Sequence, residues 1–233
     1  MDKENENNPK ETSKNIKKGK KLLKILSIII IVLVILFCIH IIRNFIIINK
    51  IFNKQAEYKD VNNYSYTSEY YSAKEDDEKT VIETYYKDGK SKLIRKGEKE
   101  ISVFYDNDTK ECIFVDNEEK EATIDYSETM LGVEKPIALE TTLQEKLLMA
   151  LLSFIRTETV NGEECYYITQ GDYNKSYVSK ETGIGIKNIS GKAVIEGKEY
   201  ESITEIKNWK INQVIDEDIT MPDISEYKII KNE

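Results

Sequence analysis

The sequence predicts an α+β protein, with an N-terminal transmembrane helix followed by an antiparallel, incompletely closed β-barrel of about ten strands under a helical lid. Three observations lead to this prediction. Residues 25–42 are apolar and carry no full charge. Short runs that alternate apolar and polar residues recur through most of the chain after residue 62. One strongly apolar helical segment, residues 142–156, interrupts these runs. Because a flat open sheet of about ten strands is uncommon, we expect the strands to curl strongly.

The apolar segment is long enough to cross a bilayer as a helix, the only single-segment structure that satisfies its own backbone in hydrocarbon. A cleavable signal peptide would have a shorter apolar core and a small-residue cleavage site. A lipoprotein signal would need a small residue before the modified cysteine, whereas Phe37 precedes Cys38. We therefore expect an uncleaved anchor that contacts the lipid bilayer through Ile25 to Ile42 in the cell membrane.

The charges around the anchor predict its orientation. Residues 1–24 contain eight lysines and four acidic residues, and the far side begins with only Arg43 and Lys50. The excess of positive charge places the N-terminus in the cytoplasm and the C-terminal domain in the extracytoplasmic space. Residues 1–24 lack hydrophobic periodicity, so we expect a disordered tail whose lysines face anionic lipid. Since the whole chain has a net charge of −8, the outer part is strongly acidic, which excludes nucleic acid as a partner.

Residues 43–62 continue with helical spacing. Phe45, Ile48, Ile51 and Phe52 fall on one stripe, which predicts a juxtamembrane helix packed on the outer domain. The β-rich ectodomain then spans residues 63–233. Its first strands include residues 64–71, which alternate sides, and a hairpin turn is expected at Asp88-Gly89.

The segment of residues 142–156 has a capping box formed by Thr142 and Glu145. Its leucines cover most of the helix circumference, so we expect a helix that lies across the sheet and is buried on more than one side. A second series of about five strands follows, separated by glycine-containing turns such as Thr182-Gly183.

Residues that carry chemistry are scarce. The only histidine, His40, lies in the predicted membrane span, which excludes histidine-based catalysis and zinc binding outside it. The carboxylates gather in charged loops, which is typical of solvated edges. We therefore expect no enzyme, no catalytic or metal-binding residues and no cofactor. Cys112 and Cys165 lie in apolar strand-like runs, and both buried free thiols and a disulfide remain open.

All 15 tyrosines follow the anchor, and two interpretations of this aromatic content remain open. Tyrosine favours strands and cross-strand pairs. Alternatively, some tyrosines line an apolar cavity between the sheet and its lid. For the second interpretation, the candidate cavity residues are Tyr64, Tyr66, Tyr70, Ile101, Val103, Tyr105, Leu147, Leu151, Phe154 and Trp209.

The C-terminal quarter resembles a known family. A turn of the type Lys-x-Thr-Gly-hydrophobic precedes hairpins, and a long strand with paired asparagines leads to Ile-Asp and a terminal proline. These positions are Lys180, Thr182, Gly183, Ile184, Asn208, Ile211, Asn212, Ile215, Asp216, Ile219 and Pro222. They resemble the closing strands of the LolA/LolB/RseB-like bacterial lipoprotein-carrier superfamily, of which this chain would be a membrane-anchored variant.

The resemblance implies an unclosed barrel whose mouth is covered by helices, with a hydrophobic cavity that takes acyl chains or lipidated or unfolded protein segments. Our first hypothesis is thus a membrane-tethered, non-catalytic, extracytoplasmic binding protein for a hydrophobic ligand, either a lipid or a lipoprotein acyl chain. The alternative is an RseB-like sensor or scaffold of the cell envelope that docks another membrane protein through its surface. Because the span has no small-x-x-x-small motif, such a partner would bind the outer domain.

Overall fold

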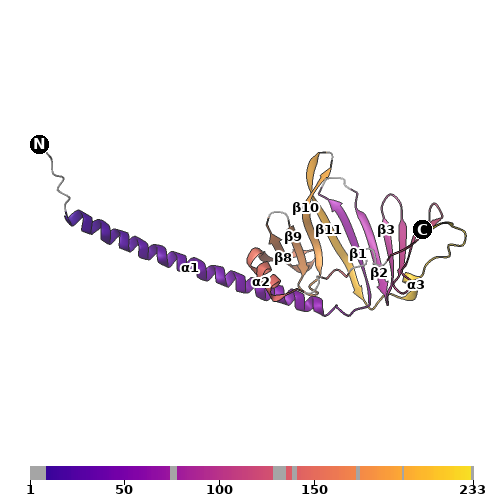
Figure 1. Ribbon diagram of the computed structural model, residues 1–233, viewed down its shortest axis with the longest axis horizontal. Helices are drawn as coiled ribbons and strands as arrows, with labels where there is room; N and C mark the ends of the chain where they lie inside the picture. Colours follow the sequence, from indigo (N-terminus) through magenta and orange to yellow (C-terminus); the bar gives the residue numbers. More distant parts are fainter. Residues whose placement is uncertain are drawn as a thin grey trace.

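The computed structural model describes residues 9–73, 78–127, 135–137, 141–171, 174–195 and 197–231. A long apolar helix leads into an open, mostly antiparallel sheet of twelve strands within these residues, with two shorter helices attached (Figure 1). The α+β prediction with an incompletely closed, barrel-like sheet is confirmed, and the sheet has two more strands than the sequence indicates.

The helix α1 runs without interruption over Pro9–Ala56. It is long and apolar enough to cross a membrane, and the side chains of its apolar segment are exposed. It includes residues 9–24, which we expected to be disordered. Seven of these residues are lysines, which extend a helix readily once the apolar segment has nucleated it. It also ends six residues before the predicted boundary at residue 62. Turns replace its last predicted residues, as in the hydrogen bond from Tyr58 N to Gln55 O at 3.0 Å.

The first strand series is a meander in which each strand pairs with the next. The Asp88-Gly89 hairpin is confirmed, because both residues have positive φ (47° and 88°), as a type I′ turn requires. The strands are β1 (Asn63–Ser72), β2 (Thr80–Lys87), β3 (Lys90–Lys96), β4 (Ile101–Asp106), β5 (Glu111–Asp116) and β6 (Glu121–Tyr126).

The apolar segment after this series is shorter than predicted as a helix. The helix α2 covers only Leu143–Leu152, and the predicted capping box between Thr142 and Glu145 is present. At Ser153 the backbone becomes extended, and the chain continues as a strand. The alternating β-branched residues after Phe154 favour an extended chain, in which Ile155 is fully buried. The expected burial on several sides is wrong as well, since among the α2 residues only Ala150 is buried.

The second strand series completes the sheet. Two elements follow the long strand β11: the short helix α3 and a last strand that returns to the first series. These elements are β7 (Phe154–Val160), β8 (Glu163–Gln170), β9 (Asn174–Ser179), β10 (Gly185–Ile195), β11 (Lys198–Ile211), α3 (Asp216–Ile219) and β12 (Lys228–Lys231).

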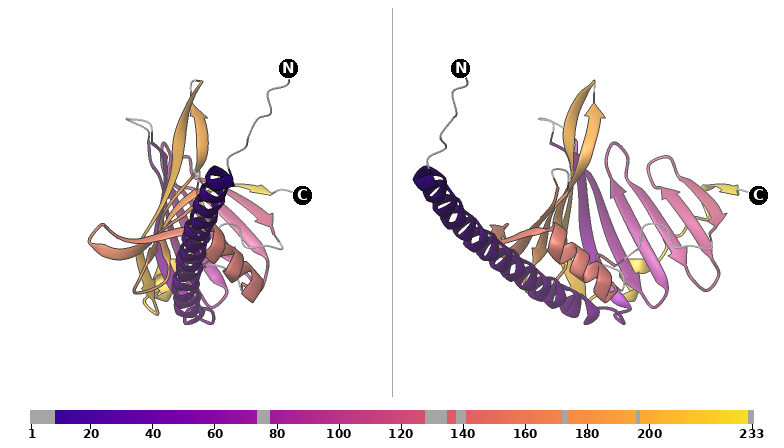
Figure 2. Two further views of the ribbon diagram at one scale, coloured as in Figure 1. Left: turned by 90° about the vertical axis from the view of Figure 1, so that its left-hand side faces the viewer. Right: turned by 60° about the vertical axis from the view of Figure 1, so that its left-hand side comes forward.

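The strand order is β12-β6-β5-β4-β3-β2-β1-β11-β10-β9-β8-β7. The pairing of β1 with β11 joins the two series, and β12 pairs with β6 in parallel. The two edge strands, β12 and β7, lie at opposite ends of this order, so the sheet is open. It curves, and α1 and α2 lie together on one side of it (Figure 2).

The two faces of the sheet differ in what they carry. We call the side against which α1 packs the helix face; there Ile48 of α1, Ala150 of α2 and Ile155 of β7 form a buried cluster. We call the other side the ion-pair face, for the network of charged side chains described below. It also carries a small apolar cluster under the C-terminal segment, formed by Phe104, Ile113, Val115 and Ala122 with Ile224 and Tyr227 against it.

Candidate functional site

The helix face carries a cluster of aromatic rings where β1 meets β11. The Trp209 ring centroid lies 5.6 Å from that of Tyr64 and 6.1 Å from that of Tyr66. Tyr86 extends the cluster along the sheet, 4.9 Å from Tyr64, and Tyr58, just after α1, meets Trp209 edge-on at 5.9 Å. Tyr64 and Tyr66 are buried, with 2% and 7% of their surface exposed. Such spacing is typical of aromatic packing that adds stability beyond burial alone.

Local backbone geometry places Trp209 in this cluster. The pairing of β1 with β11 shifts register between Ser65 and Thr67, opposite the segment that holds Trp209. Asn208 and Asn212 both have φ of 55°, a left-handed conformation that asparagine tolerates better than most residues. Asn63 closes the end of the strand, since its Oδ1 accepts a hydrogen bond from Val214 N at 2.9 Å. The two asparagines of the C-terminal motif thus shape the end of β11.

The strand register brings the predicted sheet residues to one face. Tyr70 pairs with Thr204, and pairing continues through β10, β9 and β8 to Ile155, which packs on α1. Residues directly opposite each other in a sheet point to the same side. By the same reasoning across β2, β3 and β4, the seven predicted sheet residues share the helix face: Tyr64, Tyr66, Tyr70, Ile101, Val103, Tyr105 and Trp209.

The three remaining predicted residues do not complete a cavity with these. Leu147 and Leu151 belong to α2 but remain largely exposed. Phe154 lies in β7, not in the helix, and is 54% exposed. Since its neighbour Ile155 points to the helix face, Phe154 points to the opposite side. Helical spacing had wrongly put it in line with the leucines.

Two hollows lie beside the aromatic cluster. One has a volume of about 460 Å³, and Tyr64, Tyr86 and Lys135 are among the residues that line it. The other, of about 260 Å³, is lined partly by Trp209 and Ile206. Both hollows combine apolar or aromatic side chains with several polar ones, among them Asp60 and Asp88 in the first and Lys207 in the second. Apolar surface together with polar groups that fix orientation is typical of ligand sites.

Lys135 brings a positive charge to the first hollow. Its Nζ donates a hydrogen bond to Tyr58 O at 3.2 Å and lies 6.0 Å from the centre of the Tyr64 ring. Burial lowers the pKa of Lys135. Burial also raises the pKa of the Tyr64 hydroxyl, with smaller contributions from Tyr66 and Tyr86. A charge beside apolar rings suits a ligand with a polar end and an apolar body.

α2 is fixed to α1 by one buried polar residue. Asn44 Nδ2 donates hydrogen bonds to Ser153 O at 2.7 Å and to Ala150 O at 3.0 Å, and the same nitrogen lies 3.1 Å from His40 Nε2. Asn44 is fully buried, and its Oδ1 has no hydrogen-bond partner among the residues that the structure describes. Its bonds satisfy carbonyls at the end of α2, which would otherwise lack donors. The sequence held a signal for this role, since Asn44 is a polar residue on the apolar stripe of Ile48 and Ile51.

The ion-pair face is organised around Glu205 of β11. Lys187 Nζ lies 2.8 Å from Glu205 Oε1, Lys207 Nζ lies 3.3 Å from Oε2, and the Tyr71 hydroxyl donates to Oε1 at 2.8 Å. Lys207 also pairs with Glu69 at 2.7 Å. Burial alone would raise the pKa of Glu205, but the hydrogen bonds from Lys187 and Tyr71 outweigh it and lower the pKa to about 2. This face is thus cross-linked by charge.

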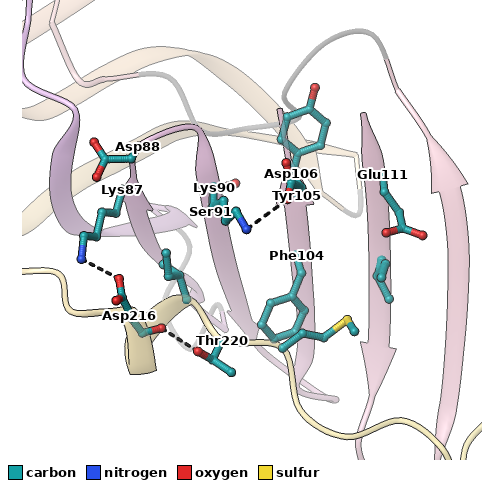
Figure 3. A pocket seen from close by; sticks show the side chains of 13 residues that line it. Lys87, Asp88, Lys90, Ser91, Phe104, Tyr105, Asp106, Glu111, Asp216 and Thr220 are labelled. Carbon is teal, nitrogen blue, oxygen red and sulfur yellow. Dashed lines mark hydrogen bonds and ion pairs between the residues drawn. The ribbon is translucent and has the colours of Figure 1, made fainter. Parts of the chain in front are cut away.

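The ion-pair face also has a pocket of about 670 Å³, beneath α3 (Figure 3). Its floor includes Phe104, and its rim carries two ion pairs: Lys87 with Asp216 at 2.6 Å and Lys90 with Asp106 at 3.3 Å. The hydrogen bond from Lys87 lowers the pKa of Asp216. Sequence reasoning missed this pocket, because α3 meets β2 and β3 only through the tertiary fold.

Both cysteines of the sheet are buried free thiols, which settles the alternative that the sequence left open. Cys112 lies on β5 and Cys165 on β8, far apart in the strand order. Burial raises the pKa of each thiol. A raised pKa leaves little of the reactive thiolate at neutral pH.

No protein-family model matches the chain, and no curated protein matches it. Among solved structures, an uncharacterized conserved protein from Thermus thermophilus is similar to it, with 9% identity over 79% of this chain and 98% of that chain and a TM-score of 0.46. A DUF1329 family protein from Desulfovibrio piger has 9% identity, coverage of 78% and 97%, and a TM-score of 0.30. A LolA superfamily protein from Nitrosomonas europaea has 13% identity, coverage of 74% and 97%, and a TM-score of 0.29.

Proposed function

We propose that this protein is a membrane-tethered, non-catalytic, extracytoplasmic binding protein for a hydrophobic ligand, a lipid or a lipoprotein acyl chain. α1 is the tether, with the N-terminus in the cytoplasm and the sheet outside the cell membrane. The exposed apolar side chains of α1 and the lysines that precede them support this arrangement.

The observation that carries the proposal is the difference between the faces of the sheet. The helix face holds the Tyr64, Tyr66 and Trp209 rings with hollows beside them, whereas the ion-pair face is closed by salt bridges near its centre. An acyl chain gains free energy from contact with apolar and aromatic surface. We place the ligand at the aromatic cluster, with its polar end toward Lys135.

The only tryptophan of the chain reports on this site directly. The full-length protein in detergent is titrated with a long-chain fatty acid while the emission of Trp209 is recorded. We expect a saturable change in emission, and Tyr66→Ala should weaken the apparent affinity by about ten-fold, the loss expected when one buried aromatic contact is removed.

Tyr167→Ala is the matched control. Tyr167 also packs against a second ring, that of Tyr177 with the centroids 5.0 Å apart, but on the ion-pair face. We expect it to leave the affinity unchanged. If emission shows no saturable response, or if both variants weaken binding equally, the ligand does not bind at the aromatic cluster.

A second function is favoured by the pocket beneath α3. Its apolar floor and paired rim charges suit an extended segment of another envelope protein, as a sensor or scaffold would bind. Crosslinking in native membranes from a photoreactive residue at Met221, which lines the pocket, should then yield a discrete protein adduct. Crosslinking to lipid alone contradicts this function.

A further inference from the structure

α2 lies at the point where α1 would leave the membrane. The uncharged segment of residues 25–42 is about 27 Å long as a helix, which matches the hydrocarbon thickness of a bilayer. Arg43 follows it directly and is exposed, as expected of a residue at the headgroups. Asn44, the next residue, holds the end of α2 through its bonds to Ala150 O and Ser153 O. The C-terminal end of α2 is therefore level with the membrane surface.

The direction of α2 follows from a second contact. Lys146 Nζ lies over the ring of Phe52, 5.2 Å from its centre. Phe52 is about 12 Å farther from the membrane along α1 than Asn44. α2 therefore runs antiparallel to α1, with its N-terminal end away from the bilayer and its C-terminal end toward it.

The residue types along α2 change from polar at its distal end to apolar at its membrane end. At its distal end, Thr142, Gln144 and Glu145 are exposed polar residues. Residues 147–155 contain no charged side chain. Leu148, Leu151 and Leu152 are exposed near the membrane, with Leu152 at 60%. Leu143 is also exposed at the distal end, but it lies among polar residues, whereas these three leucines have no charged neighbour in the chain. Exposed apolar side chains in an uncharged run of this kind indicate contact with an apolar phase.

We infer that the C-terminal half of α2 is a second membrane-contacting element, inserted at the outer headgroup boundary, so that the sheet sits directly on the bilayer. The lipid bilayer is the occupant because Asn44, which holds this end of α2, follows the exposed apolar segment of α1 by two residues. The inference rests on the proposed tether and adds to it the position of the binding domain. A lipid leaving the outer leaflet would then meet α2 first.

The test measures the depth of both ends of α2 in the full-length chain. In a Trp209→Phe background, Leu152→Trp and Leu143→Trp place a single tryptophan at either end of the helix. Both leucines are exposed, so the replacements disturb no packing. The proteins are reconstituted into phosphatidylcholine vesicles with or without bromine on the acyl chains. If Trp209→Phe lowers stability, the same pair is compared in the native background, where Trp209 contributes equally to both variants and the difference between them is read.

We expect bromine to reduce the emission of Leu152→Trp by about two-fold or more, because interfacial helices bury their apolar face about 5–10 Å into the boundary. Leu143→Trp, about 13 Å farther along the helix, should change little. Alkali extraction of the same vesicles tests the tether separately. If alkali does not extract the protein but quenching is weak and equal at both ends of α2, this inference is overturned and the tether is retained. If alkali extracts the protein from the vesicles, both the proposed tether and this inference are overturned. Quenching of Leu152→Trp that persists after transfer into detergent indicates a retained lipid and also overturns the inference.

Discussion

The two faces of the sheet bury their side chains by different interactions: apolar packing on the helix face and paired charges on the ion-pair face. On the helix face, Ile155 and the aromatic rings are buried by contact with α1, with α2 and with one another. On the ion-pair face, Glu205 has only 7% of its surface exposed and is compensated by Lys187, Lys207 and Tyr71. Apolar burial is non-directional and tolerates exchange of one apolar group for another, whereas a buried charge is tied to its partners. This difference explains why the ligand is proposed for the helix face.

The largest effect is expected from the core beneath the helices. Ile155→Ala removes a fully buried side chain that packs on Ile48 and Ala150. The free energy of unfolding should fall by about 3 kcal/mol, from lost burial and the cavity left behind. Urea unfolding of the full chain in detergent, followed by Trp209 emission, measures it. The adjacent Phe154→Ala, which changes an exposed side chain, should cost less than about 1 kcal/mol. Equal losses would mean that β7 is not held by the helices.

A smaller effect is expected where the β9–β10 turn meets α1. Gly183 has φ of 75°, and a Cβ there would lie 2.8 Å from Ile51 O and from Lys54 Cβ. Gln55 Nε2 also donates a hydrogen bond to Gly183 O at 2.7 Å. Gly183→Ala should therefore lower stability by about 2 kcal/mol, through backbone strain and collision with α1.

Gly162→Ala separates these two causes. Gly162 has φ of 83°, but a Cβ there would have no neighbour within 4 Å in the described part of the chain. It should show the strain alone, about 1 kcal/mol. If the two variants are equally stable in urea, the turn does not contact α1 in solution.

The contribution of the ion-pair face to stability should depend on pH. The pKa of Glu205 is lowered from 4.5 to about 2, so its ionised form stabilises the fold above pH 4.5, and this contribution is lost as the pH falls toward 2. Glu205→Gln should lower stability at pH 7 by about 1–2 kcal/mol and flatten the dependence between pH 4.5 and 2. Urea midpoints across this range measure both. Glu119→Gln, at an exposed carboxylate, should keep the native profile.

The smallest effect is expected at the exposed ion pairs. Lys99 contacts Glu119 at 2.8 Å, but both side chains are more than half exposed. Solvent screens such a pair, so Lys99→Ala should leave the urea midpoint unchanged within error. A clear loss of stability would show that exposed ion pairs in the turns also support the fold, so that charge would matter beyond the ion-pair face.

Much of this architecture can be predicted from local sequence patterns. The long apolar helix, the strand alternation that puts Tyr64, Tyr66 and Tyr70 on one side, and the Asp88-Gly89 turn all follow from hydrophobicity, periodicity or turn chemistry. The end of α2 does not, because Phe154 and Ile155 fit both helical and strand spacing. A short apolar run is ambiguous in this way, and tertiary contacts decide its conformation.

The residues of the candidate site also divide into those that the sequence predicts and those that it does not. The aromatic residues of the sheet were predictable because side-chain direction in a strand follows its period of two. Asn44, Lys135 and the pocket beneath α3 depend on residues that are far apart in the chain, such as Asn44 and Ser153. Such pairings involve no sequence periodicity, so a single sequence does not reveal the partners, even where a polar residue on an apolar stripe marks the position, as at Asn44.

By itself, the sequence determined the apolar span, the α+β class and the face on which most strand residues lie, since these depend on hydrophobicity and spacing along the chain. Only the tertiary structure decided that α2 packs on α1 near the end of the apolar span, that Glu205 is held by two lysines, and that the cysteines stay apart. The reason is physical: burial and hydrogen bonding between distant segments act on the whole fold, and their outcome exceeds the small preferences of local sequence.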